Sequence, residues 1–437
     1  MRQAPKRVKP GGQAGWLSRL VKPGRHRVLP SLEIRQDCSA RMSENFPLAG
    51  LRVVDLTRVL SGPFCSMILA DLGAEVIKVE TPGEGDTVRA QGAMVDGLSW
   101  YFAGFNRNKK SITLNLRDPQ AQEILASLIA GADALVENFR PGVMAAMGFD
   151  AARLHAINPR LITGSISGFG ATGPYKDRPS FDFIAQAMSG FMSINGPQGT
   201  PPVRAGNPIS DLVAGLYCAL GVIAGLLGRE RTGEAAAIAT SLNGAMIGVL
   251  GFAAANYFAT QKLPPRTGND HPVAAPYGLF RTADGEIAIA PAGEAMYRRL
   301  LKALDAEALL DRAEFATNAD RFAHRPAINA EIELRTTRHS TAHWIAVLNA
   351  AGVPCGPVLN LHEVFADPQN IDQQVSAKIH HPGHGAVEML TTPLRINGAI
   401  PPLRMPAPAL GEHTEEVLRD LGLTPEQIAA LRQAGAI

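Results

Sequence analysis

Short apolar segments alternate with segments of helical character in the first part of the chain. Residues 51–57 and 74–80 are apolar and bounded by turn residues, which predicts two buried strands. Gly62 and Pro63 interrupt the pattern between them and open a helix that ends near Asp71. A strand, a helix and a second strand in this order predict two parallel strands of one sheet.

The same alternation continues along the next ninety residues. Three further strands are expected, at residues 111–116, 134–139 and 161–167. Between the first two, Asp118 and Pro119 have the residue types that begin a helix, and Gly131 closes it. The pattern predicts an α/β fold with a Rossmann-like doubly wound parallel sheet, in which ligands bind where the strands end. Those ends carry the polar loops 57–62, 80–83 and 137–140.

Two long uncharged runs follow, at residues 212–228 and 235–261. The first is short for a membrane span, and polar residues interrupt the second, so we expect buried helices of a core or dimer interface and no membrane partner. A connector rich in proline and glycine at 262–285 then leads to a smaller α+β domain. Its expected elements are a strand at 286–292 and amphipathic helices at 297–310 and 341–351.

The C-terminal part returns to a strand pattern at residues 387–390 and ends on a helix whose capping box begins at Thr424. These changes divide the chain into four parts. They are an extension expected to be disordered (1–46), a large α/β domain (47–261), the connector with the small domain (262–375), and a C-terminal segment that returns to the large domain (376–437).

Charge and cysteine content reduce the number of possible functional classes. The chain of 437 residues has a net charge of +2, but its first 41 residues carry +8 and the remainder −6, so the body offers no basic surface for nucleic acid. The four cysteines, at positions 38, 65, 218 and 355, have no metal or redox spacing, and Cys218 is expected in the core. We expect a cytoplasmic protein, or one of the mitochondrial matrix if the source is eukaryotic and the basic extension is a transit peptide.

Three motifs have competing interpretations. Residues 168–173 (Gly-Phe-Gly-Ala-Thr-Gly) match a dinucleotide fingerprint, but Pro174 and Pro179 follow where a helix should begin, which favours a loop. The histidines at 380–384 lack further ligands at metal spacing, so we expect a solvated loop and no metal site. Asp211 precedes an apolar helix and is either its N-cap or a carboxylate nucleophile, and local sequence does not decide between them.

Taken together, the motifs resemble class III CoA-transferases, such as formyl-CoA transferase, the carnitine CoA-transferases and the succinyl-CoA-dependent dicarboxylate transferases. The resemblance extends from about residue 47 to the C-terminus. It rests on ordered matches at 47–63, 71–80, 85–86, 106–111, 136–142, 168–174, 352–357 and 410–414.

The resemblance implies an interlocked homodimer that transfers CoA from an acyl-CoA thioester to a carboxylic acid, with CoA as substrate and no tightly bound cofactor. It implies that Asp211 is the catalytic nucleophile. The implied CoA-binding residues are Leu60, Ser61, Leu114, Asn115, Leu116, Arg117, Asn138, Phe139, Arg140, Phe181 and Asp182. The implied acyl-site lid contains Gly268, Asn269, His271 and Tyr277.

The chain departs from formyl-CoA transferase at several positions. Thr81 and Ala146 stand where that enzyme has CoA-contacting arginines, Phe181 replaces a tyrosine, and the tetraglycine lid is absent. The lid and the opening motif are more similar to transferases that use succinyl-CoA and a dicarboxylate. Two alternatives stay open. One is a 2-methylacyl-CoA racemase of the same superfamily, which would need a histidine where this chain has Phe181. The other is a non-catalytic acyl-CoA-binding protein.

Overall fold

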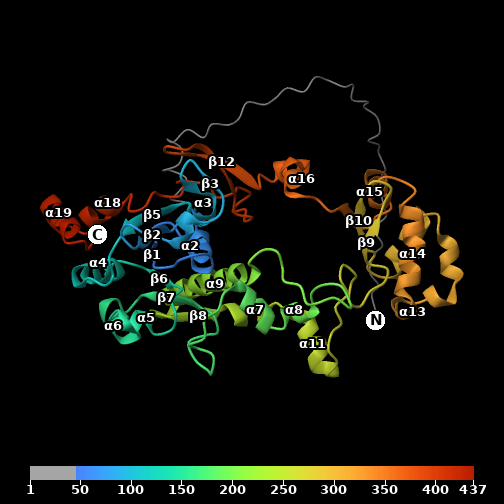
Figure 1. Cartoon of the computed structure of the whole chain (residues 1–437), viewed down its shortest axis with the longest axis horizontal. Coiled ribbons are helices and arrows are strands. Elements are labelled where there is room, and N and C mark those ends of the chain that lie inside the picture. Colours follow the sequence, from blue (N-terminus) through green and yellow to red (C-terminus); the bar gives the residue numbers. More distant parts are fainter. Residues whose placement is uncertain (1–45) are drawn as a thin grey trace, which may run out of the picture.

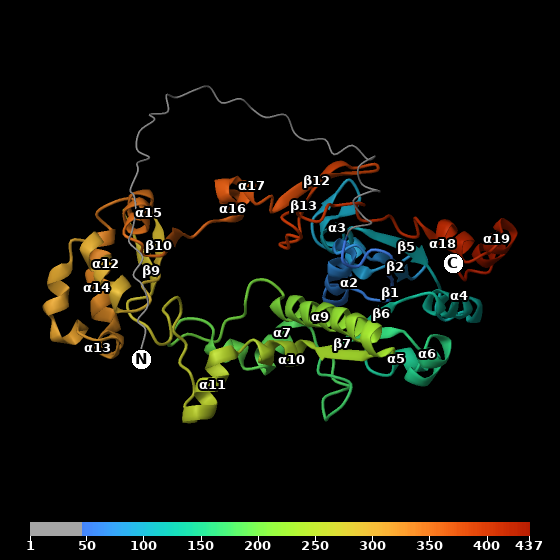
Figure 2. The same ribbon diagram turned by 180° about the vertical axis from the view of Figure 1, so that it is seen from behind.

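The computed structural model describes residues 46–437, so the predicted N-terminal extension lies, apart from Phe46, outside the described residues. The described chain forms two domains at opposite ends of an elongated molecule (Figure 1). Two separate segments connect them, one through α11 (Gly251–Thr260) and one through α16 (Leu361–Ala366). The view from behind shows the same arrangement (Figure 2).

The large domain is built on a six-stranded parallel sheet, which confirms the predicted α/β fold. The strand order is β5-β2-β1-β6-β7-β8, so the direction of winding reverses between β1 and β6. Such a reversal leaves a crevice at the carboxyl ends of the two central strands. The strands are β1 (Arg52–Asp55), β2 (Glu75–Glu80), β5 (Lys109–Thr113), β6 (Ala134–Glu137), β7 (Ile162–Ser167) and β8 (Ala237–Ser241).

The sixth strand, β8, corrects the expectation of helices throughout residues 235–261. β8 pairs in parallel with β7, from Thr163 opposite Ala237 to Ser167 opposite Ser241. It lies at the sheet edge and none of its side chains is buried, so its sequence carries no strong apolar alternation. The remainder of the run is helical, as expected, and forms α10 (Leu242–Gly248) and α11.

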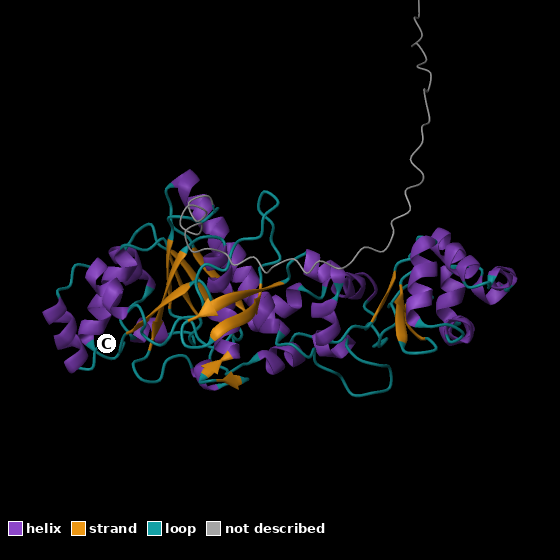
Figure 3. Ribbon diagram, turned by 90° about the horizontal axis from the view of Figure 1, so that it is seen from above, coloured by secondary structure: helices purple, strands orange, loops and turns teal. Residues whose placement is uncertain are grey.

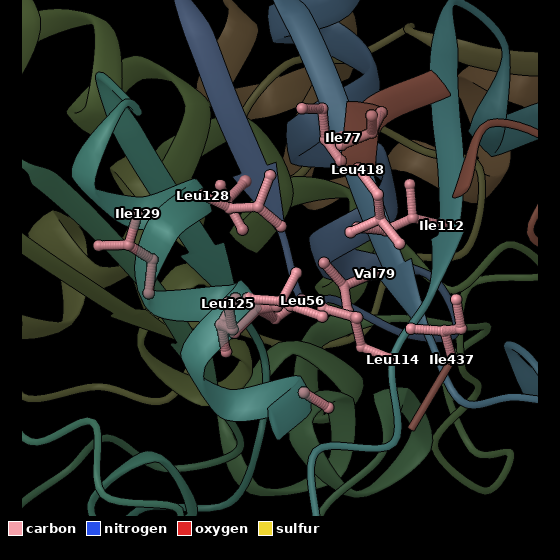
Figure 4. Packing of buried hydrophobic residues seen from close by; sticks show 14 of the residues in the cluster. Leu56, Ile77, Val79, Ile112, Leu114, Leu125, Leu128, Ile129, Leu418 and Ile437 are labelled. Atoms are coloured by element: carbon pink, nitrogen blue, oxygen red, sulfur yellow. The ribbon is translucent and has the colours of Figure 1, made fainter. Parts of the chain in front are cut away.

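Helices cover both faces of this sheet, as the view from above shows (Figure 3). One face carries α2 (Ser61–Asp71) and α9 (Ile209–Thr232), and the other carries α4 (Pro119–Ala130), α18 (Thr414–Asp420) and α19 (Pro425–Gln433). Asp118 caps α4, Pro119 is its first residue and Gly131 ends it, which confirms the predicted helix signals. Leu125, Leu128 and Ile129 of α4 pack in one core with Leu56 and Ile437 (Figure 4).

Shorter elements complete the large domain. β3 and β4 form a small hairpin before α3, and α7 and α8 follow the loop after β7. The stretch 168–173 forms turns with no helix before α7, which confirms its interpretation as a loop. The bounds are β3 (Met94–Val95), β4 (Leu98–Ser99), α3 (Trp100–Asn106), α5 (Val143–Ala146), α6 (Ala151–Ile157), α7 (Asp182–Met188) and α8 (Phe191–Ile194).

The small domain combines an antiparallel sheet of β11-β10-β9 with a group of helices. Tyr297, Leu300 and Trp344 pack against the sheet residues Phe280 and Ile287. β9 falls inside the predicted loop-rich connector, because its four residues are too short to stand out beside the surrounding prolines. The elements are β9 (Gly278–Arg281), β10 (Glu286–Ile289), β11 (Cys355–Pro357), α12 (Glu294–Ala303), α13 (Asn318–Ala323), α14 (Arg325–Thr336) and α15 (Thr341–Ala350).

The C-terminal segment runs from α17 (Pro368–Asp372) through the hairpin of β12 (Ser376–His381) and β13 (Gly385–Leu390) to α18 and α19. Val387 and Met389 of the hairpin pack with Phe102 of α3. The capping box of Thr424 begins α19, as the sequence predicts. The segment is therefore packed onto the large domain at both its hairpin and its final helices.

One helix, α9, is long and apolar enough to cross a membrane, and α10 and α11 pass the same test as a pair bent by 72°. Within the described residues, however, α9 lies against the sheet. Ala214, Cys218, Val222 and Leu226, spaced by one turn, are buried in a core that also contains Ile162 of β7. This is the packing of a core helix in an α/β domain.

Candidate active site

Asp211 lies in the first turn of α9, but it does not cap the helix. The helix begins at Ile209 and its N-cap residue is Pro208. The side chain of Pro208 accepts no hydrogen bond from the backbone N–H groups of the first turn. The interpretation of Asp211 as N-cap is therefore wrong, because the chain is already helical two residues before it. The backbone N–H of Ser210 donates to Asp182 Oδ1 at 3.0 Å, so a carboxylate from α7 satisfies this end of α9.

The Asp211 carboxyl is half-buried, and its acidity is strongly altered. Burial raises the pKa of Asp211 from its ordinary value of 3.8 to about 7, and the negative charge of Asp182 adds to the rise. A hydrogen bond from the Ser61 hydroxyl acts in the opposite direction by favouring the ionised form. A carboxyl with such a pKa, set in a crevice, is a candidate functional group.

A close approach of α9 to α2 brings Asp211 to Ser61. Gly215 lies one helical turn after Asp211, and a Cβ placed on it would stand 2.6 Å from the Ser61 backbone oxygen. Only glycine therefore allows the two helices to cross at this distance. The Ser61 hydroxyl is in turn within 3.5 Å of Asn138 Nδ2, which joins the ends of β1 and β6 beside Asp211.

A cavity of about 300 Å³ opens beside Asp211 at the carboxyl ends of β1, β6 and β7. Of the predicted site residues, Ser61, Asn138, Phe139, Arg140 and Phe181 line it together with Asp211. Four cationic side chains also line it: Arg58, Arg140, Lys176 and Arg178. Among residues 46–437, none of these four forms an ion pair. The cavity is therefore electropositive and suited to an anionic ligand.

The loop that carries Arg58 and Ser61 is held by side chains from other strands. Asn138 Oδ1 accepts from the Arg58 N–H at 2.8 Å, and its Nδ2 donates to the Arg58 carbonyl at 2.7 Å. Val59 has a φ of 69°, which is unfavourable for a β-branched residue, and its N–H donates to Asp86. The loop conformation is thus imposed by tertiary contacts and not by local preference.

Beneath this loop, buried charges form a network. Burial alone would raise the pKa of Asp55, but Lys109, Lys78 and two hydroxyls hold it below its ordinary value. Burial lowers the pKa of Lys109 to about 8, although Lys109 Nζ lies 3.1 Å from Asp55 Oδ2. Lys78 Nζ contacts Asp86 at 3.1 Å and the Thr57 carbonyl at 2.7 Å. The network connects β1, β2 and β5 to the loop above.

The remaining predicted CoA-binding residues do not share the cavity. Leu60 is buried as the N-cap of α2, and Leu114 is buried in the core. Asn115 and Arg117 lie beyond β5, the edge strand separated from β6 by β2 and β1, and Leu116 packs beside them. Asp182 is close enough to raise the pKa of Asp211, although it does not line the cavity.

The predicted lid residues lie on the connector to the small domain, away from the cavity. The Gly268 N–H donates to the Gly196 carbonyl, and the His271 and Tyr277 rings are 4.7 Å apart. Asn269 is on the same connector. Within one described chain, the structure does not bring these residues to Asp211.

Sequence reasoning missed Lys176, Arg178 and Tyr101, whereas Arg58 lies in the strand-end loop 57–62 that it expected to bind a ligand. Burial raises the pKa of Tyr101 and the charge of Asp211 adds to it, so the phenol lies near Asp211. Tyr101 follows a strand-like stretch and resembles any core aromatic, so no local signal marks it. Lys176 and Arg178 follow the end of a predicted strand, and two cations at such a place could have indicated an anion site.

Comparison with known proteins agrees with this site. The model of CoA-transferase family III matches residues 48–414. Human succinyl-CoA:glutarate CoA-transferase is 37% identical over 393 residues, which is 90% of each chain. Acetyl-CoA:oxalate CoA-transferase from Acetobacter aceti is 41% identical over 84% of this chain and 93% of its own. A CAIB/BAIF family protein from Brucella suis has a crystal structure with a TM-score of 0.77 at 40% identity, covering 86% of this chain and all of that one. The chain therefore belongs to CoA-transferase family III.

Proposed function

We propose that this CoA-transferase moves CoA from an acyl-CoA thioester to a carboxylic acid through covalent intermediates on Asp211. Family membership supports the reaction class. The observation that carries the role of Asp211 is its position in an electropositive cavity together with a pKa of about 7. A carboxylate that is partly desolvated and has a pKa near 7 is a stronger nucleophile than the carboxylate of an exposed aspartate.

The chemistry follows from the residue type. The ionised Asp211 carboxylate attacks the donor thioester carbonyl, forms a mixed anhydride and expels CoA thiolate. The thiolate then attacks the Asp211 carbonyl, which gives an enzyme thioester and releases the donor acid. The acceptor carboxylate attacks this thioester, which expels CoA thiolate and forms a second mixed anhydride. The thiolate then attacks the acceptor's acyl carbonyl, which gives the product acyl-CoA and restores the Asp211 carboxylate. The free energy of the thioester is conserved only if water is excluded, because water would hydrolyse the anhydride and thioester intermediates.

The four cations that line the cavity support CoA as the substrate that enters it. Arg58 and Arg140 come from the ends of β1 and β6, and Lys176 and Arg178 come from the loop after β7. CoA carries its phosphate charge at the end remote from the thiol, so a cavity that is lined by both cations and the Asp211 carboxyl suits its two ends. Lysine and arginine on this loop would replace the CoA-contacting arginines that positions 81 and 146 lack.

For the acid pair we propose succinyl-CoA or a similar donor and a dicarboxylic acceptor. This assignment is supported by the departures from formyl-CoA transferase and by the human relative, whose name specifies succinyl-CoA and glutarate. The racemase alternative needs acid–base groups on both faces of the α-carbon. Phe181 occupies one such position in the cavity and cannot transfer a proton.

We further propose that the active form is an interlocked homodimer. Helices α9 and α11 expose large apolar side chains, with Leu220 63% and Phe258 73% exposed. Such a surface exceeds what a monomer usually leaves in water. The lid residues at 268–277 lie far from the cavity of their own chain, and a second subunit would supply them to Asp211. The uncharged runs of the sequence would then form the dimer core.

The test is turnover with a covalent readout. Purified protein is incubated with succinyl-CoA or acetyl-CoA and a panel of mono- and dicarboxylates, and a covalent enzyme thioester is sought at Asp211 by peptide mass spectrometry. Asp211→Asn should abolish transfer and labelling. Asp305→Asn is a matched control, because Asp305 is exposed in the small domain and its φ of 49° suits asparagine. Turnover close to wild type in Asp211→Asn, or labelling of another residue, would refute the mechanism.

A further inference from the structure

We infer that Arg204 is the receptor for the second carboxylate of a dicarboxylic substrate, and this inference rests on the function proposed above. Arg204 lies on the loop between α8 and α9, seven residues before the nucleophile. Nothing in the sequence singles it out, because an arginine between a proline-rich turn and a glycine resembles a solvated loop residue. Its surroundings in the structure give it a specific position.

The backbone around Arg204 is held in place. The Ala205 N–H donates to Gln186 Oε1 at 2.8 Å, and Gln186 is fully buried. On the other side, Asn195 Nδ2 donates to the Val203 carbonyl at 2.8 Å. A loop anchored on both sides of one residue presents that side chain from a fixed point. The backbone of Arg204 is therefore held in place, although its side chain is exposed.

This loop is linked to the residue that precedes Asp211. Gln186 Nε2 also donates to Asp182 Oδ2 at 2.8 Å, and Asp182 Oδ1 accepts from both the N–H and the hydroxyl of Ser210, at 3.0 and 2.9 Å. Ser210 immediately precedes Asp211. Hydrogen bonds through Gln186 and Asp182 thus link the backbone next to Arg204, at Ala205, to Ser210 in the first turn of α9.

The guanidinium itself is available to a ligand. Its Nη1 lies 3.9 Å from Asp182 Oδ2, which is too long for a hydrogen bond, and 51% of the side chain is exposed. Both Asp182 oxygens already accept hydrogen bonds from other groups, so Asp182 does not require Arg204 as a donor. Among residues 46–437, no acceptor takes a hydrogen bond from the Arg204 side chain. The planar guanidinium can donate two parallel N–H hydrogen bonds to the two oxygens of a carboxylate.

Charge explains why such a cation is needed. A dicarboxylate that presents one end to the neutral Asp211 thioester brings its second negative charge into a region that already contains the Asp182 carboxylate. Like charges at short distance in a partly buried site repel, which would exclude the substrate. Arg204 contacts Asp182 and has unused donors, so it offsets this repulsion for a dicarboxylate and provides nothing comparable to a monocarboxylate. It is therefore a specificity-determining residue.

The experiment compares succinate with butyrate, which has nearly the same chain length but only one carboxylate. With one acyl-CoA donor, kcat/KM is measured for both acceptors in the wild type, in Arg204→Met and in Arg204→Lys. We expect wild type to prefer succinate and Arg204→Met to lower the succinate-to-butyrate ratio about a hundred-fold, mainly through the succinate KM. Arg204→Lys should lie between the two, because lysine keeps the charge without the fork.

Arg178→Met is the matched control among the cavity cations. It should raise the KM for acyl-CoA and leave the succinate-to-butyrate ratio unchanged, since we assign Arg178 to the CoA phosphates. Equal losses for both acids in Arg204→Met would give Arg204 a structural role and overturn the inference while the transferase function stands. Absence of a succinate preference in wild type would overturn it as well. Absence of any transfer by wild type, together with no thioester at Asp211, would remove the proposed function and this inference with it.

Discussion

Replacement of Asp211 by asparagine should make the folded protein more stable at alkaline pH while it abolishes activity. The pKa of Asp211 rises from 3.8 to about 7 in the folded state, chiefly through burial. Each unit corresponds to about 1.4 kcal/mol, so the folded state would pay up to about 4 kcal/mol for ionising this carboxyl. Because the side chain is only half-buried, we expect solvent screening to reduce this to about 2 kcal/mol.

An opposing effect is smaller. An ionised carboxylate in the first turn of a helix interacts favourably with the helix dipole, and asparagine loses that interaction, which contributes about 0.3–1 kcal/mol. Burial therefore dominates, and Asp211→Asn should gain about 1–2 kcal/mol at pH 8. For a chain of this length such a change raises the melting temperature by about 2 °C. A residue that serves catalysis often lowers the stability of the folded protein, and a buried carboxylate is expected to do so.

The pH dependence identifies the origin of the gain. At pH 4 the carboxyl is protonated in the folded protein and only about half ionised in the unfolded protein, so wild type and variant should differ little in melting temperature. As the pH rises towards 7, the unfolded carboxyl ionises freely while the folded one does not, and wild type loses stability relative to the variant. The difference should be complete above the folded pKa of about 7.

The assay is thermal unfolding of wild type, Asp211→Asn and the control Asp305→Asn at half-unit steps from pH 4 to 8.5. In parallel, kcat/KM of wild type should rise about ten-fold from pH 6 to 8, because the ionised carboxylate is the nucleophile and only about a tenth is ionised one unit below its pKa. A constant difference in melting temperature across this range, or a less stable variant at pH 8, would show that Asp211 has an ordinary pKa and would refute the reasoning.

Three further predictions concern the surroundings of the site. Asp182→Asn removes a charge that raises the pKa of Asp211, so the acidic limb of the kcat/KM profile should move to lower pH; an unchanged profile would place the cause in burial alone. Lys109→Met leaves the buried Asp55 without its ion-pair partner and should lower the free energy of unfolding in urea by about 3 kcal/mol. The control Lys110→Met, at a partly exposed ion pair with Glu75, should change it by less than about 1 kcal/mol. Leu220→Asp, on the exposed face of α9, should convert a dimer that persists at nanomolar concentration into monomers by mass photometry; a wild type that is already monomeric there contradicts the interlocked assembly.

Local sequence determined the elements whose signals are short-range. The strands of the β-α-β units, the Asp118 cap with Pro119, and the box at Thr424 each depend on residues a few positions apart, and the structure contains them. The family could also be identified from the sequence, because many motifs occur in order and each is formed by contiguous residues. Asp211 was singled out in the same way, by its place before a long apolar helix.

The tertiary structure decided what depends on residues distant in sequence. β8 is a strand because β7 pairs with it, although its exposed side chains carry no pattern of their own. The N-cap residue of α9 has no side chain that accepts a hydrogen bond from the helix. Asp182, 28 positions before Ser210, provides the acceptor for the Ser210 N–H instead. Asp182 also raises the pKa of Asp211, and Arg204 lies 3.9 Å from Asp182. The pKa of the nucleophile and the recognition of its substrate depend on distances across the fold, and no local pattern encodes a distance between segments that only packing brings together.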